Sequence, residues 1–358
     1  MHLKDKAKQL PELPGVYLMK DSQSNIIYVG KAKSLKNRVS QYFQNSRKHT
    51  PKIVRMVESI KDFETILADT ELEALLLECR LIKDLKPIYN SQLKNHQRYV
   101  FININIEEPY PTIEVVAEKK ETGLNFGPYN SLSSAERGAN AIKENMRLRH
   151  CRSLSSKESG CLNYQLGFCA APCTGEISNH EYRRLVDQAV DFLKGGKSDL
   201  IKQLNRRMIA AAEALDFDKA VKYRDDLTAL KHLMYKGETV KFTGDNRCMA
   251  ALERMEGSEY KFFLIKGSRI IYKKILLYTE DKSQLQQHMV SMILQNRVQL
   301  QKREAINIDK QDIDQVQIVY SYLKNKRECS YIVVPQSWLK KKDSSRLEQG
   351  IMKLTNML

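Results

Sequence analysis

Residues 14–38 have the sequence PGVYLMKDSQSNIIYVGKAKSLKNR, and this stretch decides the fold of the first part of the chain. Two apolar segments, 14–20 and 26–29, flank the polar sequence DSQSN, and this arrangement predicts a β-hairpin. A basic helix is expected at 34–43, with a serine as its cap and apolar residues at helical spacing. Four side chains suited to phosphate chemistry therefore fall close together in the sequence: Tyr17, Tyr28, Lys31 and Arg38.

The two tyrosines are predicted to lie on adjacent strands, where their phenol groups can converge on one face of the hairpin. A phenol with an ordinary pKa of about 10 is a poor base at neutral pH. We expect the neighbouring ammonium group of Lys31 to favour the phenolate by its charge. Arg38 can hold a phosphate through two parallel hydrogen bonds, which lysine cannot do. Each residue by itself is more often an ordinary strand aromatic or a solvated charge, so the interpretation depends on the combination.

The pattern beyond this stretch predicts one compact α/β (α+β) domain at 11–92 with a small mixed sheet. A helix that begins with a proline, a strand at 63–68 and a helix at 70–85 with a capping box complete the domain. Glu78 falls at the edge of the apolar stripe of the last helix, where a carboxylate needs a partner such as a hard divalent cation. Asn90 follows this helix, and its side-chain amide is expected to brace the loop.

Positive charge predominates in the chain and is concentrated beside this motif. Of its 358 residues, 59 are Lys or Arg and 43 are Asp or Glu, which gives a net charge of +16. No acidic residue occurs from 22 to 57, whereas eight basic residues occur from 31 to 55. Such a surface favours a nucleic-acid partner, because lysine and arginine release counterions from phosphates, and a merely soluble basic protein is the alternative. The candidate DNA contacts are Lys33, Lys36, Arg47, Lys48 and Lys52.

Seven cysteines occur in a chain whose first residues lack the apolar core of a secretory signal. No segment approaches the roughly 20 apolar residues of a membrane span, so we expect a cytoplasmic location, no membrane partner and reduced thiols. Four cysteines lie in a loop-like region with spacings unlike those of common zinc ribbons. Their thiolates could hold zinc or an iron–sulfur cluster, and four unrelated buried cysteines are the alternative. These four are Cys151, Cys161, Cys169 and Cys173, while core positions are expected for Cys79, Cys248 and Cys329.

The cysteine-rich loop belongs to a region at 93–196 that is predicted to contain two paired strands, a tight turn at 126–129 and a helix capped by Ser133. Two amphipathic helices follow at 197–235 and are predicted to pair as a helical hairpin. So short a pair cannot bury its apolar stripe internally, so the stripe is expected to dock on the chain itself or on a partner helix pair. The last segment, 240–358, is predicted to be a mixed α/β linker domain.

The motifs GVY, YVG and GKAK, followed in order by Arg38, Tyr42, Glu78 and Asn90, resemble the GIY-YIG nuclease pattern. The similarity extends to ALLLE, KPIYN, FGPYNS and CLNYQLGFCAAPCTG, and it covers residues 11–235. The chain is therefore similar to the N-terminal half of the UvrC family, the incising subunits of bacterial nucleotide excision repair. The segment MIAAAEALDFDKAVKYRDDLTAL looks like the UVR motif through which UvrC meets UvrB.

This resemblance implies hydrolysis of one DNA strand on the 3′ side of a lesion. Tyr28 or Tyr17 would activate the attacking water with help from Lys31, and the choice between the two tyrosines stays open. The same resemblance implies roles for Arg38 at the scissile phosphate, Tyr42 in the lining of the site, Glu78 as the ligand of one Mg²⁺ or Mn²⁺, and Asn90 in supporting the geometry.

The resemblance also implies partners and a second metal site. It favours an iron–sulfur cluster of the 4Fe-4S type at the four loop cysteines, with zinc as the alternative. Damaged double-stranded DNA is the implied substrate and UvrB the implied partner, with UvrA acting upstream. A plain helical hairpin that packs on its own domain is the alternative to UvrB binding. The residues expected to meet UvrB are Leu204, Met208, Leu215, Phe217, Val221, Arg224 and Leu227.

The chain departs from the family in its last third, because full UvrC chains continue into an RNase H-like nuclease and helix-hairpin-helix modules. The order of elements after 245 superficially resembles an RNase H fold, but the acidic residues there form no convincing Asp-Asp-His cluster. We therefore expect the 5′ incision to be missing. The alternative functions are a non-catalytic UvrB-binding adaptor, which would not need the intact set of site residues, and a mobile-element or restriction GIY-YIG nuclease, which would not need the cysteine loop.

Overall fold

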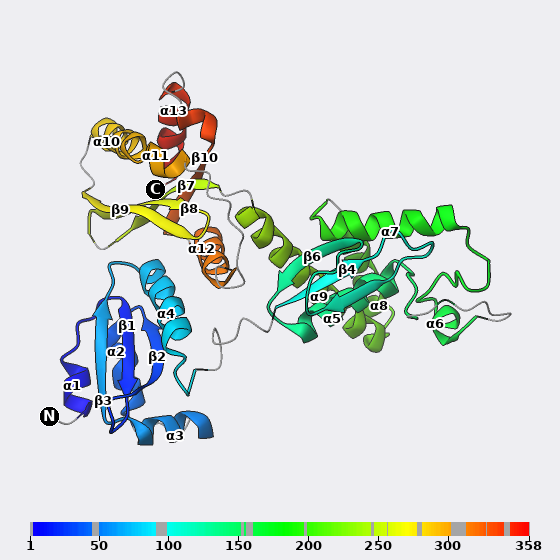
Figure 1. Ribbon diagram of the computed structural model, residues 1–358, viewed down its shortest axis with the longest axis horizontal. Coiled ribbons are helices and arrows are strands. Elements are labelled where there is room, and N and C mark those ends of the chain that lie inside the picture. Colours follow the sequence, from blue (N-terminus) through cyan, green and yellow to red (C-terminus); the bar gives the residue numbers. More distant parts are fainter. Residues whose placement is uncertain are drawn as a thin grey trace. The chain divides into compact units, whose positions relative to one another are not determined.

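The structure is a computed structural model, and the chain in it forms two compact units (Figure 1). Met1–His96 and Phe242–Leu358 make up the first unit, and Gln97–Lys241 makes up the second. The structure describes residues 3–44, 50–90, 99–151, 154, 160–196, 199–244, 247–255, 257–277, 281–301, 313–326, 328–339 and 344–357.

The first part of unit one is a three-stranded antiparallel sheet with the strand order β2-β1-β3. The predicted hairpin is confirmed, as are the helix after it and the helix with the capping box. The Ser34 side chain accepts a hydrogen bond from the backbone N–H of Asn37. In the capping box of α4, the Thr70 hydroxyl oxygen accepts a bond from the backbone N–H of Glu73, and the Glu73 carboxylate accepts one from the backbone N–H of Thr70. The elements are α1 (Leu3–Lys8), β1 (Gly15–Lys20), β2 (Ile26–Ala32), α2 (Leu35–Tyr42), α3 (Pro51–Ser59), β3 (Asp62–Leu67) and α4 (Glu71–Leu85).

The side chains of the central strand β1 alternate between two separate cores. Tyr17 and Met19 pack with α2 and α3 on one face, and Val16 and Leu18 pack with α4 on the other. Because β2 is an edge strand, residues from α2 on one face and from α4 on the other can meet beside it. The order of the strands therefore places a site at the open edge of β2.

Two glycines of the opening motif are required by close approaches in this sheet. Gly30 on β2 pairs with Tyr17 on β1, and a Cβ at Gly30 would lie 2.3 Å from the Tyr17 hydroxyl oxygen. A Cβ at Gly15 would lie 2.5 Å from the carbonyl oxygen of Ile66 on β3. Real Cβ atoms do not approach other heavy atoms so closely, so any larger residue would displace Tyr17 or β3.

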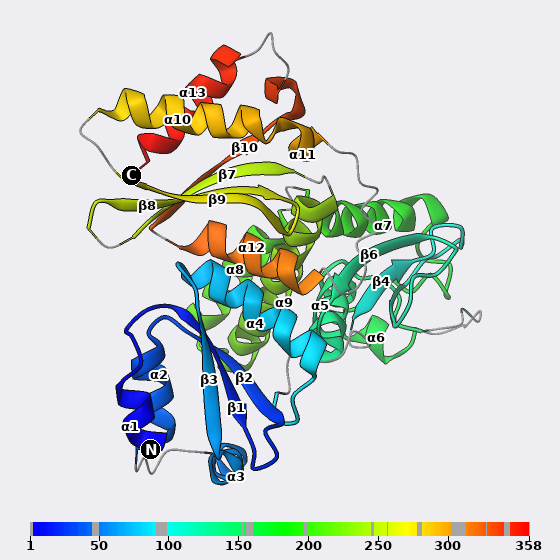
Figure 2. The same ribbon diagram turned by 60° about the vertical axis from the view of Figure 1, so that its left-hand side comes forward.

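The second part of unit one is a four-stranded antiparallel sheet with the order β10-β7-β8-β9. The mixed α/β character predicted for this segment is confirmed, and α10 and α13 share one hydrophobic core with the sheet. Helix α12 contacts α4, and Figure 2 shows these two helices side by side. The elements are β7 (Cys248–Arg254), β8 (Glu259–Lys266), β9 (Arg269–Leu277), α10 (Lys282–Gln295), α11 (Arg297–Gln301), α12 (Ile313–Asn325), β10 (Cys329–Val334), the 3₁₀ helix η2 (Gln336–Leu339) and α13 (Ser344–Thr355).

Unit two contains a three-stranded antiparallel sheet with the order β5-β4-β6, together with the helical hairpin. One hydrophobic core contains residues from the sheet, from α5 and α7, and from both hairpin helices. No helix among the described residues is long and apolar enough to cross a membrane. The elements are β4 (Val100–Ile104), β5 (Ile113–Val116), β6 (Leu124–Tyr129), α5 (Leu132–Asn145), α6 (Leu162–Gln165), α7 (Asn179–Leu193), α8 (Leu200–Glu213) and α9 (Phe217–Gly244).

Two predictions for unit two are wrong. Residues 126–129 form the end of β6 and not a turn, because β6 is an edge strand, where Pro128 can lack an N–H without breaking the sheet. Ser131 caps α5 in place of Ser133, since the Ser131 hydroxyl oxygen accepts a hydrogen bond from the backbone N–H of Ser134. Both errors arise where several turn-forming residues follow one another in the sequence.

Candidate active site at the open edge of the first sheet

A cavity of about 370 Å³ lies beside β2, between residues of α2, α3 and α4. It brings together five of the predicted catalytic residues and one predicted DNA contact, from three separate parts of the sequence. Tyr17 and Lys31, although both are described, are not among the residues that line it. The lining residues are Tyr28, Arg38, Tyr42, Thr50, Lys52, Ile53, Met56, Glu78, Ile82, Tyr89 and Asn90.

Three tyrosines form a compact group at the wall of this cavity. The ring centres of Tyr17 and Tyr28 are 6.1 Å apart, and Tyr42 lies 5.8 Å from the first and 6.4 Å from the second. The hydroxyl groups of Tyr17 and Tyr42 are hydrogen-bonded at 2.8 Å, and Tyr17 is only 1% exposed. Tyr17 therefore supports the wall from behind, whereas Tyr28 presents its phenol group to the cavity.

Burial raises the pKa of both Tyr17 and Tyr28, and the neighbouring Tyr42 raises the pKa of each further. The cation that acts on these two phenols is Arg38, whose charge lowers their pKa values by less than burial raises them. The expectation that Lys31 favours the phenolate does not agree with the structure, because its ammonium group binds Glu71. Both phenols are therefore neutral at ordinary pH.

Glu78 is the buried carboxylate of the cavity. Its Oε1 accepts a hydrogen bond of 2.9 Å from the backbone N–H of Lys31. Burial raises the pKa of Glu78, and the bond from Lys31 and the charges of Lys31 and Arg38 oppose this effect only in part. A carboxylate in this state gains from a bound cation, and one carboxylate completed by water and phosphate oxygens is a donor set that Mg²⁺ commonly uses. The residues present therefore fit a divalent cation.

Arg38 and Asn90 complete the lining of the cavity. The Arg38 guanidinium lies over the Tyr42 ring at 5.3 Å and donates a hydrogen bond of 3.2 Å to the Gln41 side chain. Asn90 pairs with the unpaired edge of β2, since its Nδ2 donates to the Val29 carbonyl at 2.8 Å and its Oδ1 accepts from the Val29 N–H at 3.0 Å. Asn90 thus holds the strand residue next to Tyr28, rather than only the loop in which it lies.

Glu71 is a residue of this region that the sequence interpretation missed. The ammonium group of Lys31 lies 2.5 Å from Glu71 Oε1, and that of Lys33 lies 3.2 Å from Oε2. The only sequence signal for Glu71 was its acidic place in the first turn of α4, which is common near helix N-termini. Its partners, Lys31 on β2 and Lys33 just after it, follow from the three-dimensional fold.

The predicted DNA-contacting residues differ in their surroundings. Lys33 has a side chain that is 71% exposed, although it pairs with Glu71, and Lys36 pairs with Glu12 at 2.9 Å. Lys52 lines the cavity itself. Arg47 and Lys48 lie outside the described residues.

The four loop cysteines are close enough for their charges to interact. Cys169 is buried, and its Sγ accepts a hydrogen bond of 3.3 Å from the Ala171 N–H. Burial raises the pKa of Cys169, and the thiols of Cys161, Cys151 and Cys173 raise it further. The described residues nevertheless contain no group of three or more His, Cys, Asp or Glu side chains arranged to hold a metal ion. As arranged here the residues do not fit zinc or a cluster, so the cysteine metal site stays a prediction. The core positions expected for Cys79, Cys248 and Cys329 are confirmed.

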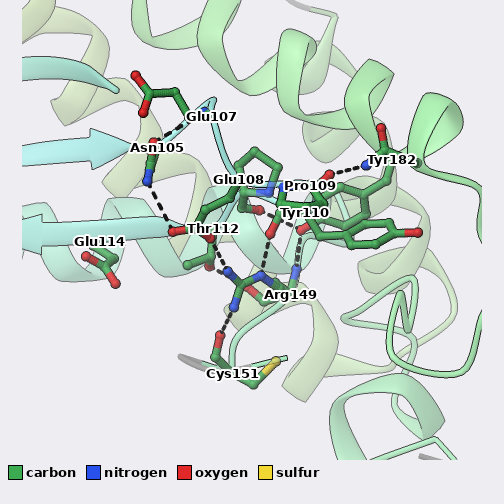
Figure 3. Close-up of polar contacts among 12 residues, drawn as sticks. Asn105, Glu107, Glu108, Pro109, Tyr110, Thr112, Glu114, Arg149, Cys151 and Tyr182 are labelled. Atoms are coloured by element: carbon green, nitrogen blue, oxygen red, sulfur yellow. Dashed lines mark hydrogen bonds and ion pairs between the residues drawn. The ribbon is translucent and has the colours of Figure 1, made fainter. Parts of the chain in front are cut away.

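Arg149 fixes the start of the cysteine loop, as Figure 3 shows. Its side chain is 4% exposed, and it donates hydrogen bonds of 2.5 Å to the carbonyl oxygens of Tyr110 and Cys151. It also pairs with Glu108, while the Tyr182 hydroxyl accepts a bond from the Arg149 backbone N–H. Nothing in the sequence distinguished Arg149 from the other basic residues, because its burial depends on contacts between distant segments.

The hairpin residues predicted to meet a partner divide into two groups. Leu204 and Leu227 are 0% and 4% exposed and belong to the core of unit two, so their prediction as free contact residues is wrong. Met208 packs partly against the same core. The exposed members are Leu215, Phe217 and Val221, at 72%, 63% and 45%, together with Arg224, which pairs with Asp225. The hairpin thus packs on its own unit and still presents an apolar patch around its turn.

The β-hairpin of β1 and β2, the basic helix α2 and the buried carboxylate of Glu78 together define a GIY-YIG domain. Residues 13–91 match the family described as the UvrC-like GIY-YIG domain. Residues 99–192 match the UvrC/Cho excinuclease middle domain, and residues 198–233 match the UvrB/uvrC motif. The chain belongs to the UvrC family.

The relatives of this chain include several proteins named UvrABC system protein C. The protein from Caldanaerobacter subterraneus subsp. tengcongensis is 43% identical over 274 residues, which cover 75% of this chain and 44% of that protein. The protein from Acetivibrio thermocellus is 36% identical over 343 residues, which cover 93% of this chain and 55% of that protein. The chain therefore spans about half the length of the curated relatives that it matches.

A solved structure with a similar sequence is the GIY-YIG N-terminal endonuclease domain of UvrC from Thermotoga maritima, described as bound to its catalytic divalent cation, magnesium. It is 41% identical, with 25% of this chain and 94% of that chain covered and a TM-score of 0.23.

Proposed function

We propose that this chain is a divalent-metal-dependent DNA endonuclease of nucleotide excision repair, which nicks the damaged strand 3′ of the lesion in complex with UvrB. The observation that supports this proposal best is the cavity at the edge of β2, where Tyr28, Arg38, Tyr42 and Glu78 meet. These groups supply a phenol that can activate the attacking water, a cation that can hold the phosphate and a carboxylate that can bind a metal ion. Relatives named UvrABC system protein C support the same pathway.

Glu78 is the residue that would hold the Mg²⁺ or Mn²⁺ ion. When bound, the ion would polarise the scissile phosphate and stabilise the leaving oxyanion. The Thermotoga maritima domain, which is 41% identical to this chain in the matched part, binds magnesium as its catalytic cation. The backbone N–H of Lys31 orients the Glu78 carboxylate for that task.

Tyr28 is the tyrosine that we propose to activate the attacking water, because its phenol lines the cavity and Tyr17 does not. Its raised pKa keeps the phenol protonated at rest, so positive charge must assist its ionisation. Arg38 supplies this charge from within the cavity and can also hold two phosphate oxygens. The Tyr42 ring contacts both residues, because its centre lies 6.4 Å from that of Tyr28 and the Arg38 guanidinium lies over it at 5.3 Å.

The partners proposed for the chain are damaged duplex DNA and UvrB, with UvrA upstream, in a cytoplasmic setting. Lys33 and Lys52 are the described lysines best placed to contact the DNA backbone, because one is exposed and the other lines the cavity. The exposed apolar residues around the hairpin turn are the candidate UvrB contact, since residues 198–233 match the UvrB/uvrC motif.

The test is a strand-specific nicking assay on a duplex with one defined lesion, in the presence of UvrA, UvrB, ATP and Mg²⁺. A single cut 3′ of the lesion that is lost in Glu78→Gln and Arg38→Ala is the expected result. Activity that survives either substitution contradicts the site, and a cut 5′ of the lesion contradicts the interpretation of 240–358. No cut on either strand, with UvrB binding intact, favours the non-catalytic adaptor.

A further inference from the structure

Helix α4 holds residue 31 of the edge strand at two points. The backbone N–H of Lys31 donates to Glu78 Oε1 at 2.9 Å, and its ammonium group lies 2.5 Å from Glu71 Oε1. Glu71 and Glu78 are seven residues apart, which is close to two helical turns, so both carboxylates face the same strand. The same residue of β2 therefore joins the proposed metal ligand to a second carboxylate.

Glu71 is itself fixed by several partners. Its side chain is 12% exposed, and its Oε2 lies 3.2 Å from the Lys33 ammonium and 3.7 Å from the Lys326 ammonium. Although burial by itself would raise it, the hydrogen bonds and charges of Lys31 and Lys33 hold the pKa of Glu71 below its ordinary value. Its place in the first turn of α4 adds the favourable end of the helix dipole. Glu71 is therefore an ionised and well-ordered anchor.

The segment 242–358 contributes to this anchor from the same unit. Lys326 lies 3.1 Å from the buried carboxylate of Glu253 and 3.0 Å from the Tyr322 hydroxyl, so its position is set by its own domain. Further ion pairs join the two parts beside the N-terminal end of α4, Lys261 with Asp69 and Lys273 with Glu73. The contact of α12 with α4 lies alongside (Figure 2).

We infer that Glu71 is a positioning residue for the metal ion of the proposed nuclease. By binding the Lys31 side chain, it holds residue 31 against α4, and the Lys31 backbone N–H then orients the Glu78 carboxylate toward the cavity. This inference rests on the proposed function, because it gives Glu78 the role of metal ligand. Residues that orient a metal ligand without touching the ion commonly change metal affinity about 10–100-fold when they are replaced.

The test measures Mn²⁺ binding to the full chain without DNA. The electron paramagnetic resonance signal of free Mn²⁺ reports how much of the ion stays unbound. Glu71→Gln keeps the size of the side chain and removes the ion pair with Lys31, and we expect Mn²⁺ binding to weaken about tenfold. Glu73→Gln is the matched control, because Glu73 lies in the same helical turn and also pairs with a lysine of segment 242–358, yet it does not bind Lys31. Its Mn²⁺ affinity should match that of the wild-type chain. Circular dichroism and thermal unfolding establish that the variants fold.

A double-variant cycle separates positioning from a general loss of negative charge. Lys31→Met should weaken Mn²⁺ binding as Glu71→Gln does, and the double variant should be no weaker than either single variant. Wild-type affinity in Glu71→Gln, or an equal loss in Glu73→Gln, overturns this inference and leaves the proposed function intact. Absence of Mn²⁺ binding by the wild-type chain overturns both, and loss of binding in Glu78→Gln is the check that the measured ion is the proposed one.

Discussion

Replacement of Gly30 by alanine tests the physical basis of the opening motif. The new Cβ would lie 2.3 Å from the hydroxyl oxygen of Tyr17 and 2.5 Å from its Cζ. Tyr17 is 1% exposed and hydrogen-bonded to Tyr42 at 2.8 Å, so its ring has no free space to which it can move. The substitution therefore displaces the phenol, the strand or both.

The magnitude follows from three contributions. Overpacking of a dense core costs about 1–3 kcal/mol. Loss of the buried bond between the Tyr17 and Tyr42 hydroxyl groups adds about 1 kcal/mol. Replacing glycine also restricts the unfolded chain, which offsets roughly 0.5–1 kcal/mol of this cost. We expect a net loss of about 2 kcal/mol, which corresponds to a roughly 30-fold larger constant for local opening of the sheet.

The assay is native-state hydrogen exchange followed on peptides from β1 and β2. Exchange of these amides should be about 30-fold faster in Gly30→Ala, while peptides from β4 in unit two serve as the internal control and should not change. In Tyr17→Phe the atom nearest to the new methyl group is absent, so Gly30→Ala should cost less in that background. Exchange within about threefold of the wild-type rate, or an equal cost in both backgrounds, would refute the steric argument.

Four further predictions concern function. Burial raises the pKa of Glu78, so this carboxyl binds a proton at a higher pH than free glutamate does. The Mg²⁺ concentration for half-maximal nicking should therefore rise as the pH falls through that pKa. A half-maximal Mg²⁺ concentration that does not change with pH would contradict the role of Glu78 as metal ligand. Tyr28→Phe should lower the single-turnover nicking rate by about 10²-fold or more, and Tyr17→Phe should lower it by less, because of these two tyrosines only Tyr28 lines the cavity. Equal losses in the two variants would leave the choice between them as the base open. Phe217→Ser should weaken UvrB binding at least tenfold in a calorimetric titration without changing the midpoint of thermal unfolding. Leu204→Ala should instead destabilise unit two by about 2–5 kcal/mol. Unchanged UvrB affinity in Phe217→Ser would exclude the turn of the helical hairpin as the contact. In keeping with the arrangement of the described cysteines, elemental analysis of the wild-type chain purified anaerobically should find neither iron nor zinc; bound iron or zinc that Cys169→Ser removes would contradict this expectation and support the predicted cysteine site.

The sequence predicted the first domain well because its signals are local. The capping serine of α2, the capping box of α4 and the polar turn between β1 and β2 each act within a few residues, and each forms as predicted. The two errors in unit two occur where local signals compete. Several serines offered a cap to α5, and Gly127-Pro128 resembles a turn wherever the surrounding strand order is unknown.

The candidate site was predictable in its membership but not in its contacts. Tyr28, Arg38 and Glu78 could be chosen from residue type and order, and the structure brings all three to one cavity. The partner of Lys31 could not be chosen, because an ion pair between β2 and the start of α4 depends on how the helix crosses the sheet. For the same reason, an apolar stripe alone could not separate Leu204 in the core from exposed hairpin residues.

The open edge of β2 explains why the site forms where it does. A strand with one unpaired side offers backbone groups that the rest of the sheet cannot satisfy, and here they are bound by side chains that also serve the site. Asn90 binds both backbone groups of Val29, and Glu78 binds the N–H of Lys31. Glu71 and Glu78 of α4 are thus held in place by residue 31 of β2, and these two carboxylates in turn hold that strand in place. A substitution that loosens the edge at any of these points should therefore weaken metal binding as well as the sheet, which is why Glu71 and Asn90 can influence the proposed reaction without touching the scissile phosphate.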